Sequence, residues 1–251
     1  MSKFKIGVLI LLALCFAMPA FAVDGVVLIN QATVTAAGGF PYTITQQGSY
    51  KLSGNLTVSG ATDGIDINTD NVSIDLNGFT ISGPVVCSES GPASSITCTW
   101  SSANGIKSSS NNIAVRNGVI RGFGFGMSLL GNNNTVEEMA VSGNAQTGIV
   151  VYNGVVRRNT ASHNGYLGII AWDSTVTENV ANHNFAGGIG AYHSTVIQNT
   201  AVANGGSGLY ADDAVLYGSN TFFGNSSGAV YGGSGSSVSQ GNNLCGPSTS
   251  C

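Results

Sequence analysis

The second half of the sequence repeats itself every twenty residues. The stretch STVTENVANHNFAGGIGAYH begins at residue 174, and the similar stretch STVIQNTAVANGGSGLYADD begins at residue 194. Five such windows align without gaps, and they begin at residues 134, 154, 174, 194 and 214. A fixed period of this length predicts a stack of similar structural units, in which each unit packs against its neighbours.

Each repeat carries four apolar positions, which polar residues and turns separate. No stretch has the spacing of an amphipathic helix, and a chain with 36 glycines and 8% charged residues is poor in helix formers, so we expect short strands. In a parallel stack, residues twenty apart become vertical neighbours about 4.8 Å apart. The predicted inward columns are Val136, Val156, Val176, Val196 and Leu216; Val141, Ala161, Ala181, Ala201 and Thr221; Ile149, Ile169, Ile189, Leu209 and Ala229; and Val151, Ala171, Ala191, Ala211 and Tyr231.

Asparagine and glycine recur in phase at the expected turns. Asparagine tolerates left-handed turn conformations, and its amide can bond to the same amide one coil away. Glycine adopts a positive φ angle without steric cost, so a glycine column predicts a left-handed corner. The asparagine ladders are Asn159, Asn179 and Asn199, and Asn144, Asn164, Asn184 and Asn204; the glycine column is Gly148, Gly168, Gly188, Gly208 and Gly228.

The stretches NTVEEMAVSGNAQTGI, STVTENVANHN and NVSIDLNGFTISG resemble the repeats of right-handed parallel β-helix proteins of the pectate-lyase-like superfamily. The resemblance covers roughly residues 50 to 245 and implies an all-β fold. We expect a single right-handed parallel β-helix, a solenoid of roughly nine coils with about 20 residues in each. Lyases, hydrolases, epimerases and adhesins share this fold, so the resemblance implies no single activity.

The enzyme motifs of this superfamily are incomplete here. Polygalacturonases carry N-T-D, D-D, G-H-G and R-I-K, whereas this chain has only Asn68-Thr69-Asp70 and Asp212-Asp213, several coils apart. Pectate lyases use an arginine base beside calcium-binding carboxylates. The acids nearest to the arginines of this chain, Glu137 and Glu138, resemble a charge pairing instead. Neither activity is therefore transferred to this chain.

The first 22 residues predict a secretory signal peptide. Lys3 and Lys5 give a basic start, an apolar run follows, and Ala20-Phe21-Ala22 fits a cleavage site. We therefore expect a secreted or periplasmic protein without a membrane span. Loss of the leader leaves six of the eight basic residues against twelve acidic ones, a formal charge of −6. That balance argues against nucleic acid as a partner.

The rest of the chain divides into three predicted segments. Residues 23–55 form an N-terminal cap, residues 56–245 form the β-helix with an inserted disulfide loop at 84–104, and residues 246–251 form a C-terminal tail closed by a disulfide. Four cysteines outside the leader allow three pairings. The local pairing is favoured, Cys87 with Cys98 and Cys245 with Cys251, because each pair brackets a short loop rich in Gly, Ser and Pro.

Strand alternation predicts an aromatic strip on the outer surface. With Ile149 and Val151 inward, one outward column is Tyr152, Trp172, Tyr192 and Asp212, and Tyr210 belongs to the column beside it. Aromatic faces stack on sugar rings, so we expect the strip to contact polysaccharide or cell-surface glycan. Two alternatives stay open: the rings stack on one another and stabilise the coils, or the strip meets another protein and the chain is a structural or adhesive rod.

A polar column predicts a candidate acid/base site. Asp173, His193 and Asp213 follow Asn153 at twenty-residue spacing, which places an imidazole between two carboxylates. Such a set can transfer protons in glycoside hydrolysis or elimination, so a polysaccharide-active enzyme is the alternative function. The competing interpretation is a solvated polar turn.

Two other groups of titratable residues recur or cluster in the sequence. His163 and His183 have no carboxylate in their column and are expected at the surface. Asp63, Asp66, Asp70 and Asp75 crowd one N-terminal coil and are candidates for Ca²⁺, but their spacing matches no known calcium loop. We therefore assign no metal site and no cofactor.

Overall fold

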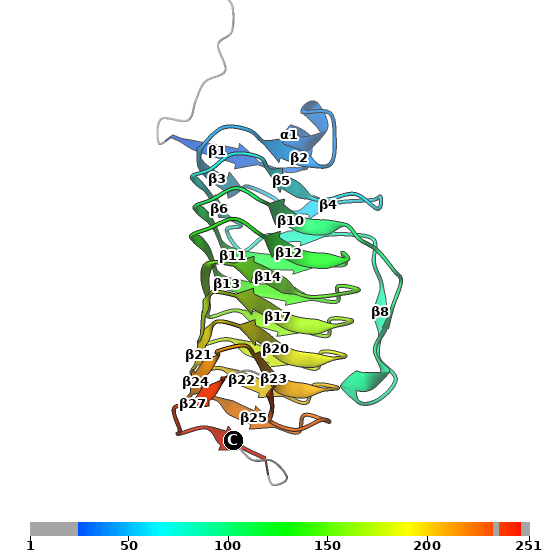
Figure 1. Cartoon of the computed structure of the whole chain (residues 1–251). Coiled ribbons are helices and arrows are strands. Elements are labelled where there is room, and N and C mark those ends of the chain that lie inside the picture. Colours follow the sequence, from blue (N-terminus) through cyan, green and yellow to red (C-terminus); the bar gives the residue numbers. More distant parts are fainter. Residues whose placement is uncertain (1–24, 233–235, 247–251) are drawn as a thin grey trace, which may run out of the picture.

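The computed structural model describes residues 25–232 and 236–246 of the chain. The predicted signal peptide (1–22) and Cys251, the expected partner of Cys245, lie outside the described residues. The described chain winds into one stack of about 10 turns with about 21 residues in each (Figure 1). The all-β, right-handed parallel β-helix is therefore confirmed, with slightly more turns than expected.

One wall of the stack is a nine-stranded parallel sheet, to which each coil contributes one strand. Its register joins Ile149 to Ile169 and Ile169 to Ile189, the predicted vertical neighbours. Its strands are β2 (Tyr42–Ile44), β5 (Ile65–Ile67), β10 (Asn104–Ser108), β12 (Phe125–Leu129), β14 (Ile149–Tyr152), β17 (Leu167–Trp172), β20 (Gly187–Tyr192), β23 (Ser207–Asp212) and β26 (Val230–Gly232).

A seventeen-stranded sheet forms the remaining walls, because most coils contribute two short strands to it. β13 (Asn134–Ser142) runs through both walls and pairs with β15 (Gly154–Arg157) and β16 (Thr160–Ser162). The other strands are β1 (Val26–Ile29), β3 (Gly48–Leu52), β4 (Leu56–Thr57), β6 (Val72–Asp75), β7 (Thr80–Ser82), β11 (Ile113–Arg121), β18 (Thr175–Thr177), β19 (Val180–Asn182), β21 (Thr195–Ile197), β22 (Thr200–Val202), β24 (Leu216–Gly218), β25 (Thr221–Phe223), β27 (Val238–Ser239) and β28 (Leu244–Cys245).

The segment predicted as a cap contributes β1, β2 and β3 to these walls, together with one short helix. Helix α1 (Gln31–Ala36) lies at the N-terminal end of the stack (Figure 1). It begins at a capping box, in which Asn30 and Thr33 satisfy each other's backbone N–H groups. Its Val34 is fully buried, so the helix covers this end of the core.

The insertion between β7 and β10 leaves the stack and runs alongside the coils (Figure 1). It contains the antiparallel pair β8 (Cys87–Ser88) and β9 (Thr97–Cys98) and the 3-10 helix η1 (Ala93–Ser95). The predicted disulfide between Cys87 and Cys98 is present and ties the two strands together. The insertion contacts the stack where the carbonyl of Ser101 accepts from the side chain of Gln146 at 3.0 Å.

The core is a narrow column of mostly aliphatic side chains inside the walls, with Phe123 and Phe222 as its largest fully buried members. Val156, Val176, Ile169, Ile189 and Ala181 have no solvent exposure, as their twenty-residue spacing predicts. Each coil places the same side chains above those of the coil before it. The core is therefore continuous along the stack, and no single coil is able to bury its own apolar side chains.

The two asparagine ladders are confirmed, and both are buried. The Asn179 side chain donates to Oδ1 of Asn199 at 3.0 Å and to the carbonyl of Val156 at 2.8 Å. In turn it accepts from the side chain of Asn159 at 3.0 Å. The second ladder repeats this pattern, with Asn164 donating to Asn184 at 2.9 Å. Each buried amide thus has partners, which is what burial of a polar group requires.

The coils turn at corners whose residues have positive φ angles. At the corner between β15 and β16, and at its equivalents one coil away, Glu138, Arg158 and Glu178 have φ of 55°, 54° and 57°. Two further columns of positive φ are His163, His183 and Ala203, and Asn153, Asp173, His193 and Asp213.

The predicted glycine column has a different cause from the one we expected. From Gly148 to Gly208 the column has no positive φ, and only Gly228 has one, at 106°. A Cβ atom on Gly188 would lie 2.6 Å from the carbonyl oxygen of Gly208 and 2.7 Å from Cβ of Ala201. From Gly148 to Gly208, glycine is needed because neighbouring coils approach closely, and not for its backbone freedom. Gly228 is one residue out of register with them, and its positive φ is one that glycine adopts readily.

The fifth repeat slips by one residue against the others. Asp213 and Ala214 both have positive φ, so this turn holds an additional residue. A slip of one residue moves side chains to the opposite face of a strand, so the inward assignments of Leu216, Thr221 and Tyr231 are wrong. The observed pairs are Val196 with Tyr217, Ala201 with Phe222, Leu209 with Val230, and Ala211 with Gly232.

Candidate aromatic pocket

The predicted aromatic strip lies on the outer face of the nine-stranded sheet. Tyr152 pairs with Trp172, and Trp172 pairs with Tyr192, on successive strands. The rings of Trp172 and Tyr192 stack with centroids 5.0 Å apart and planes 8° from parallel. Tyr152 meets Trp172 edge-on, with centroids 4.4 Å apart. The vertical neighbours are therefore as predicted, but these rings pack against one another.

This packing changes which ring is available to a ligand. Because Trp172 lies between Tyr152 and Tyr192, its two neighbours cover its faces and the strip is not a flat platform. Self-stacking, one of the alternatives left open by the sequence, thus describes this half of the strip. Tyr192 is the last ring of the stack, because the next residue in its column is Asp212.

A pocket of about 270 Å³ lies next to Tyr192. Its walls include four tyrosines, and the carboxylate of Asp212 is the one acidic group in its lining. The tyrosines come from four successive coils: Tyr166 precedes β17, Tyr192 ends β20, Tyr210 lies on β23 and Tyr231 on β26. The pocket is therefore concave and aromatic, with polar atoms at its edge.

The ring of Tyr210 is held in place by the backbone beneath it. Its hydroxyl donates to the carbonyl of Ala186 at 3.1 Å and accepts from the N–H of Ser207 at 3.3 Å. A Cβ atom on Gly187 would overlap this ring, so a glycine is required there for the tyrosine to lie flat on the sheet. This wall of the pocket is preformed, which lowers the entropic cost of binding.

The pocket perturbs the ionisation of Tyr192. Burial raises the pKa of the Tyr192 phenol, and the neighbouring carboxylate of Asp212 raises it further. The phenol therefore stays protonated at neutral pH, where its O–H is a hydrogen-bond donor and its oxygen an acceptor.

Only part of this pocket was predicted from the sequence, namely Tyr192, Tyr210 and Asp212, but not Tyr166 and Tyr231. Tyr231 was assigned to the core because the one-residue slip was not foreseen. It is in fact 60% exposed and lies beside Tyr210, with centroids 5.7 Å apart and ring planes tilted by 56°. Tyr166 lies in a turn, where strand alternation makes no prediction. The additional residue in the turn before β24, where Asp213 and Ala214 both have positive φ, could not be identified from the sequence.

The predicted acid/base set is only partly assembled. His193 Nδ1 lies 3.8 Å from Asp173 Oδ1, and both side chains are more than half exposed. The contact between His193 and Asp213 is through the backbone, with the His193 N–H donating to the Asp213 carbonyl at 2.7 Å. An open groove of about 370 Å³ borders Asp173. The structure thus brings one carboxylate to the imidazole, in a solvated turn.

The four N-terminal aspartates do not converge on one point. Asp70 accepts from Asn111, and Asp75 pairs with Arg116 at 3.2 Å. Asp63 and Asp66 lie side by side, and burial, followed by the charge of Asp63, raises the pKa of Asp66. Among the residues that the structure describes, no three His, Cys, Asp or Glu side chains are grouped to hold a metal ion.

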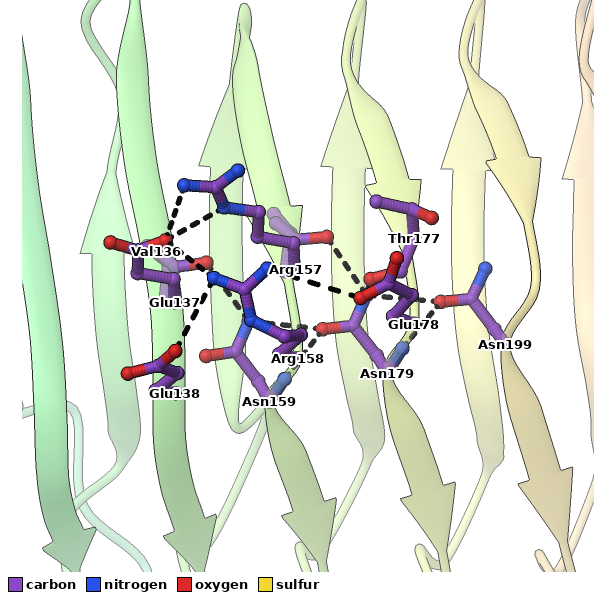
Figure 2. A network of polar contacts seen from close by, with 11 residues as sticks. Val136, Glu137, Glu138, Arg157, Arg158, Asn159, Thr177, Glu178, Asn179 and Asn199 are labelled. Atoms are coloured by element: carbon purple, nitrogen blue, oxygen red, sulfur yellow. Dashed lines mark hydrogen bonds and ion pairs between the residues drawn. The ribbon is translucent and has the colours of Figure 1, made fainter.

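The arginines next to the asparagine ladder form ion pairs, as their spacing indicated. Figure 2 shows Arg157 beside Glu137, at 2.6 Å, and Arg158 between Glu137 and Glu138, at 3.2 and 3.3 Å. Arg158 also reaches Glu178 on the next coil at 3.9 Å. Both cations are thus paired with carboxylates, so this cluster is a charge network along the stack.

His163 and His183 are surface residues, as predicted, but His163 has a carboxylate partner. The two rings stack with centroids 5.2 Å apart. His163 Nε2 lies 3.4 Å from a carboxylate oxygen of Glu89, which belongs to the inserted loop. Because Glu89 is 74 residues earlier in the chain, twenty-residue spacing gave no indication of this contact.

Three solved structures are similar to this chain. They are the enzymatically active domain of tailspike protein 2 from bacteriophage CBA120 (TM-score 0.51, 11% identity, 83% of this chain and 40% of that one), the A-module of the mannuronan C-5 epimerase AlgE4 from Azotobacter vinelandii (0.49, 15%, 73% and 62%) and the catalytic domain of Agl-KA (0.49, 15%, 76% and 43%).

The likeness to the tailspike domain supports the parallel β-helix fold and nothing finer. The chain spans between 40% and 62% of the length of those three structures, and the identities are low. No protein-family model and no curated protein matches the sequence. Because one fold hosts many activities, the function must be argued from the pocket.

In the described part of the chain, no helix has the length and apolar character needed to cross a membrane.

Proposed function

We propose that this protein is an exported β-helix protein that binds polysaccharide or cell-surface glycan in the aromatic pocket. The observation that carries the proposal is the 270 Å³ pocket, in which Tyr192, Tyr210 and Tyr231 stand around a space bordered by Asp212. We assign glycan contact to these residues and to Tyr166, and a supporting role to the stacked Tyr152 and Trp172.

The chemistry of the pocket suits a sugar ring. A pyranose has an apolar face of C–H groups, which packs on aromatic rings, and a rim of hydroxyls, which need hydrogen-bond partners. The tyrosine rings supply the aromatic surface, and the Asp212 carboxylate and the Tyr192 phenol supply the hydrogen-bond partners. The single carboxylate in the lining favours a neutral sugar, because an acidic one would face a like charge.

Export is consistent with the disulfide in the inserted loop. Disulfides such as that between Cys87 and Cys98 persist in oxidising compartments and are rare in the cytosol. Together with the predicted leader, this supports a secreted or periplasmic location.

A screen of the mature chain on a glycan array, followed by affinity measurement on the best ligand, tests the proposal. Tyr231→Ala and Tyr192→Ala are each expected to weaken binding about tenfold, since each removes one aromatic contact. Phe223→Ala is the matched control, because Phe223 is an exposed aromatic on the seventeen-stranded sheet. Unchanged affinity in both tyrosine variants would place the ligand elsewhere.

A second candidate function is catalysis on polysaccharide, with Asp173, His193 and Asp213 as the acid/base set. The contact between Asp173 and His193, beside an open groove, favours it. Assays for new reducing ends and unsaturated products test it: turnover that is lost in His193→Ala establishes the enzyme, and binding without turnover excludes it for that ligand. If no glycan binds in the screen and Trp172→Ala alters the assembly of the protein, the result supports a structural or adhesive rod.

A further inference from the structure

The aromatic pocket is rich in ring faces and poor in groups that bond to sugar hydroxyls. Apart from its four tyrosines and Asp212, the lining consists of Leu167 and Ala186. The hydroxyl of Tyr210 already donates to the carbonyl of Ala186 and accepts from the N–H of Ser207. This tyrosine therefore offers a ligand mainly the face of its ring.

The rings of the pocket are not coplanar. The planes of Tyr210 and Tyr231 are tilted by 56°, with centroids 5.7 Å apart. Trp172, on the preceding coil, stacks on one face of Tyr192. The opposite face of Tyr192 is therefore directed to the next coil, where Asp212 is its vertical neighbour. Ring faces thus border the pocket from different directions, beside one carboxylate.

The half of the stack that holds the pocket is acidic. The six Lys and Arg residues outside the predicted leader all lie at or before residue 158, whereas residues 159–251 contain four acidic residues and no Lys or Arg. No Lys, Arg or His is among the described residues that line the pocket. Burial, and then the charge of Asp212, raises the pKa of Tyr192, so this carboxylate acts directly on the ring. A cation that enters the pocket is attracted without a competing positive charge.

These properties are the ones that a quaternary ammonium group requires. Such a group carries a permanent positive charge and has no N–H, so it needs no hydrogen-bond acceptors. The faces of aromatic rings attract a cation that lies within about 6 Å of their centroids, and several rings around one cation form an aromatic cage. A primary ammonium fits less well, because it is strongly hydrated and would leave N–H groups without partners here.

We propose that the aromatic pocket binds a quaternary ammonium group, such as that of choline, between the ring faces of Tyr192, Tyr210 and Tyr231 and the carboxylate of Asp212. The inference rests on the proposed function, since the group is expected as a substituent of the glycan that occupies the pocket. The volume of about 270 Å³ is below the roughly 300–1,000 Å³ of pockets that enclose drug-sized molecules, so one small group fills it.

Calorimetric titration of the mature chain with choline tests the inference. The matched ligand is the neutral tert-butyl analogue of choline, in which carbon replaces the charged nitrogen. Choline is expected to bind at least about tenfold more tightly than this analogue, because only choline carries the charge. Asp212→Asn is expected to remove most of that preference. Tyr231→Leu is expected to weaken choline binding about fivefold, whereas Tyr231→Phe keeps the ring and stays within about twofold of the wild type.

Glu178→Gln is the control, because it removes a carboxylate from the same half of the stack but outside the pocket. It is expected to bind choline as the wild type does. Equal binding of choline and its neutral analogue overturns the inference, and so does equal binding of choline by Asp212→Asn and the wild type. Equal binding of ethanolamine, a primary ammonium, overturns it too, because it would show a simple charge site.

Glycans with and without phosphocholine substituents separate this inference from the proposed function. Glycan binding that depends on Tyr231 but not on the substituent, without binding of choline, overturns the inference and leaves the proposed function intact. Binding of choline without binding of any glycan supports the cation site and overturns the glycan as its carrier. Tighter binding of the substituted glycan supports both.

Discussion

Two columns of turn residues recur at the same spacing, and they behave in opposite ways. Asn159, Asn179 and Asn199 are 1% exposed and linked amide to amide at 3.0 Å. Asp173 and His193 are more than half exposed, and their side chains approach only to 3.8 Å. Equal spacing in the sequence therefore predicts which residues are vertical neighbours. It does not predict whether water lies between their side chains.

Burial is what separates the two columns. A buried amide that loses its partner is left without any hydrogen bond, whereas an exposed carboxylate exchanges its partner for water. The same difference applies to a ligand site. A His–Asp contact in an exposed turn contributes little to the free energy of binding, whereas side chains that line a pocket contribute more. This is why the aromatic pocket, and not the turn, carries the proposed function.

Breaking the buried ladder is expected to have the largest effect. Asn179→Ala removes the donor to Asn199 and Val156 and the acceptor for Asn159, so several buried groups lose their partners. We expect a loss of about 3 kcal/mol in the free energy of unfolding, measured by denaturant titration. As the exposed control, Asn153→Gly keeps a residue suited to its positive φ, and a loss comparable to that of Asn179→Ala would contradict the comparison.

The second largest loss of stability is expected from adding a side-chain atom where neighbouring coils approach closely. Gly188→Ala places a Cβ atom 2.6 Å from a carbonyl oxygen of the next coil, and we expect a loss of about 2 kcal/mol. Gly60→Ala is the control, because nothing lies within 4 Å of its Cβ position and its φ is not positive. Equal thermal stability of the two variants would show that the coils separate easily.

A smaller effect is expected from Asp66, whose carboxyl is partly buried. Because its pKa is raised in the folded state, the folded protein binds more protons than the unfolded one between the ordinary Asp pKa and the raised value. Its contribution to stability is therefore present at low pH and is lost as pH rises through that window. Asp66→Asn is expected to remove this slope; an unchanged pH profile of unfolding between pH 3 and 7 would contradict it.

The smallest effect is expected in the exposed column. His193→Gln removes the contact to Asp173, and we expect the free energy of unfolding to change by less than about 0.5 kcal/mol. The measurement is the same denaturant titration, at low salt, where an exposed ion pair has its greatest effect. A loss of 2 kcal/mol or more would show that this turn is as important as the buried ladder.

The sequence predicted the contacts that run along the stack and missed those that run across it. Ile169 above Ile149 and Trp172 above Tyr152 were expected, because both pairs follow from the period alone. Tyr231 was placed on the wrong face, since one additional residue in a turn is invisible until the strands are paired. The contact of His163 with Glu89 joins a coil to a long insertion, and the period says nothing about where an insertion folds back.

The period of twenty was therefore enough to establish the parallel β-helix, its core columns and its asparagine ladders, because a stacked fold converts regular spacing into vertical contact. The aromatic pocket, the contact of the inserted loop with His163 and the stacking of Trp172 on Tyr192 required coordinates. They depend on side-chain direction at turns and on an insertion with no repeat, and neither property is encoded in a period.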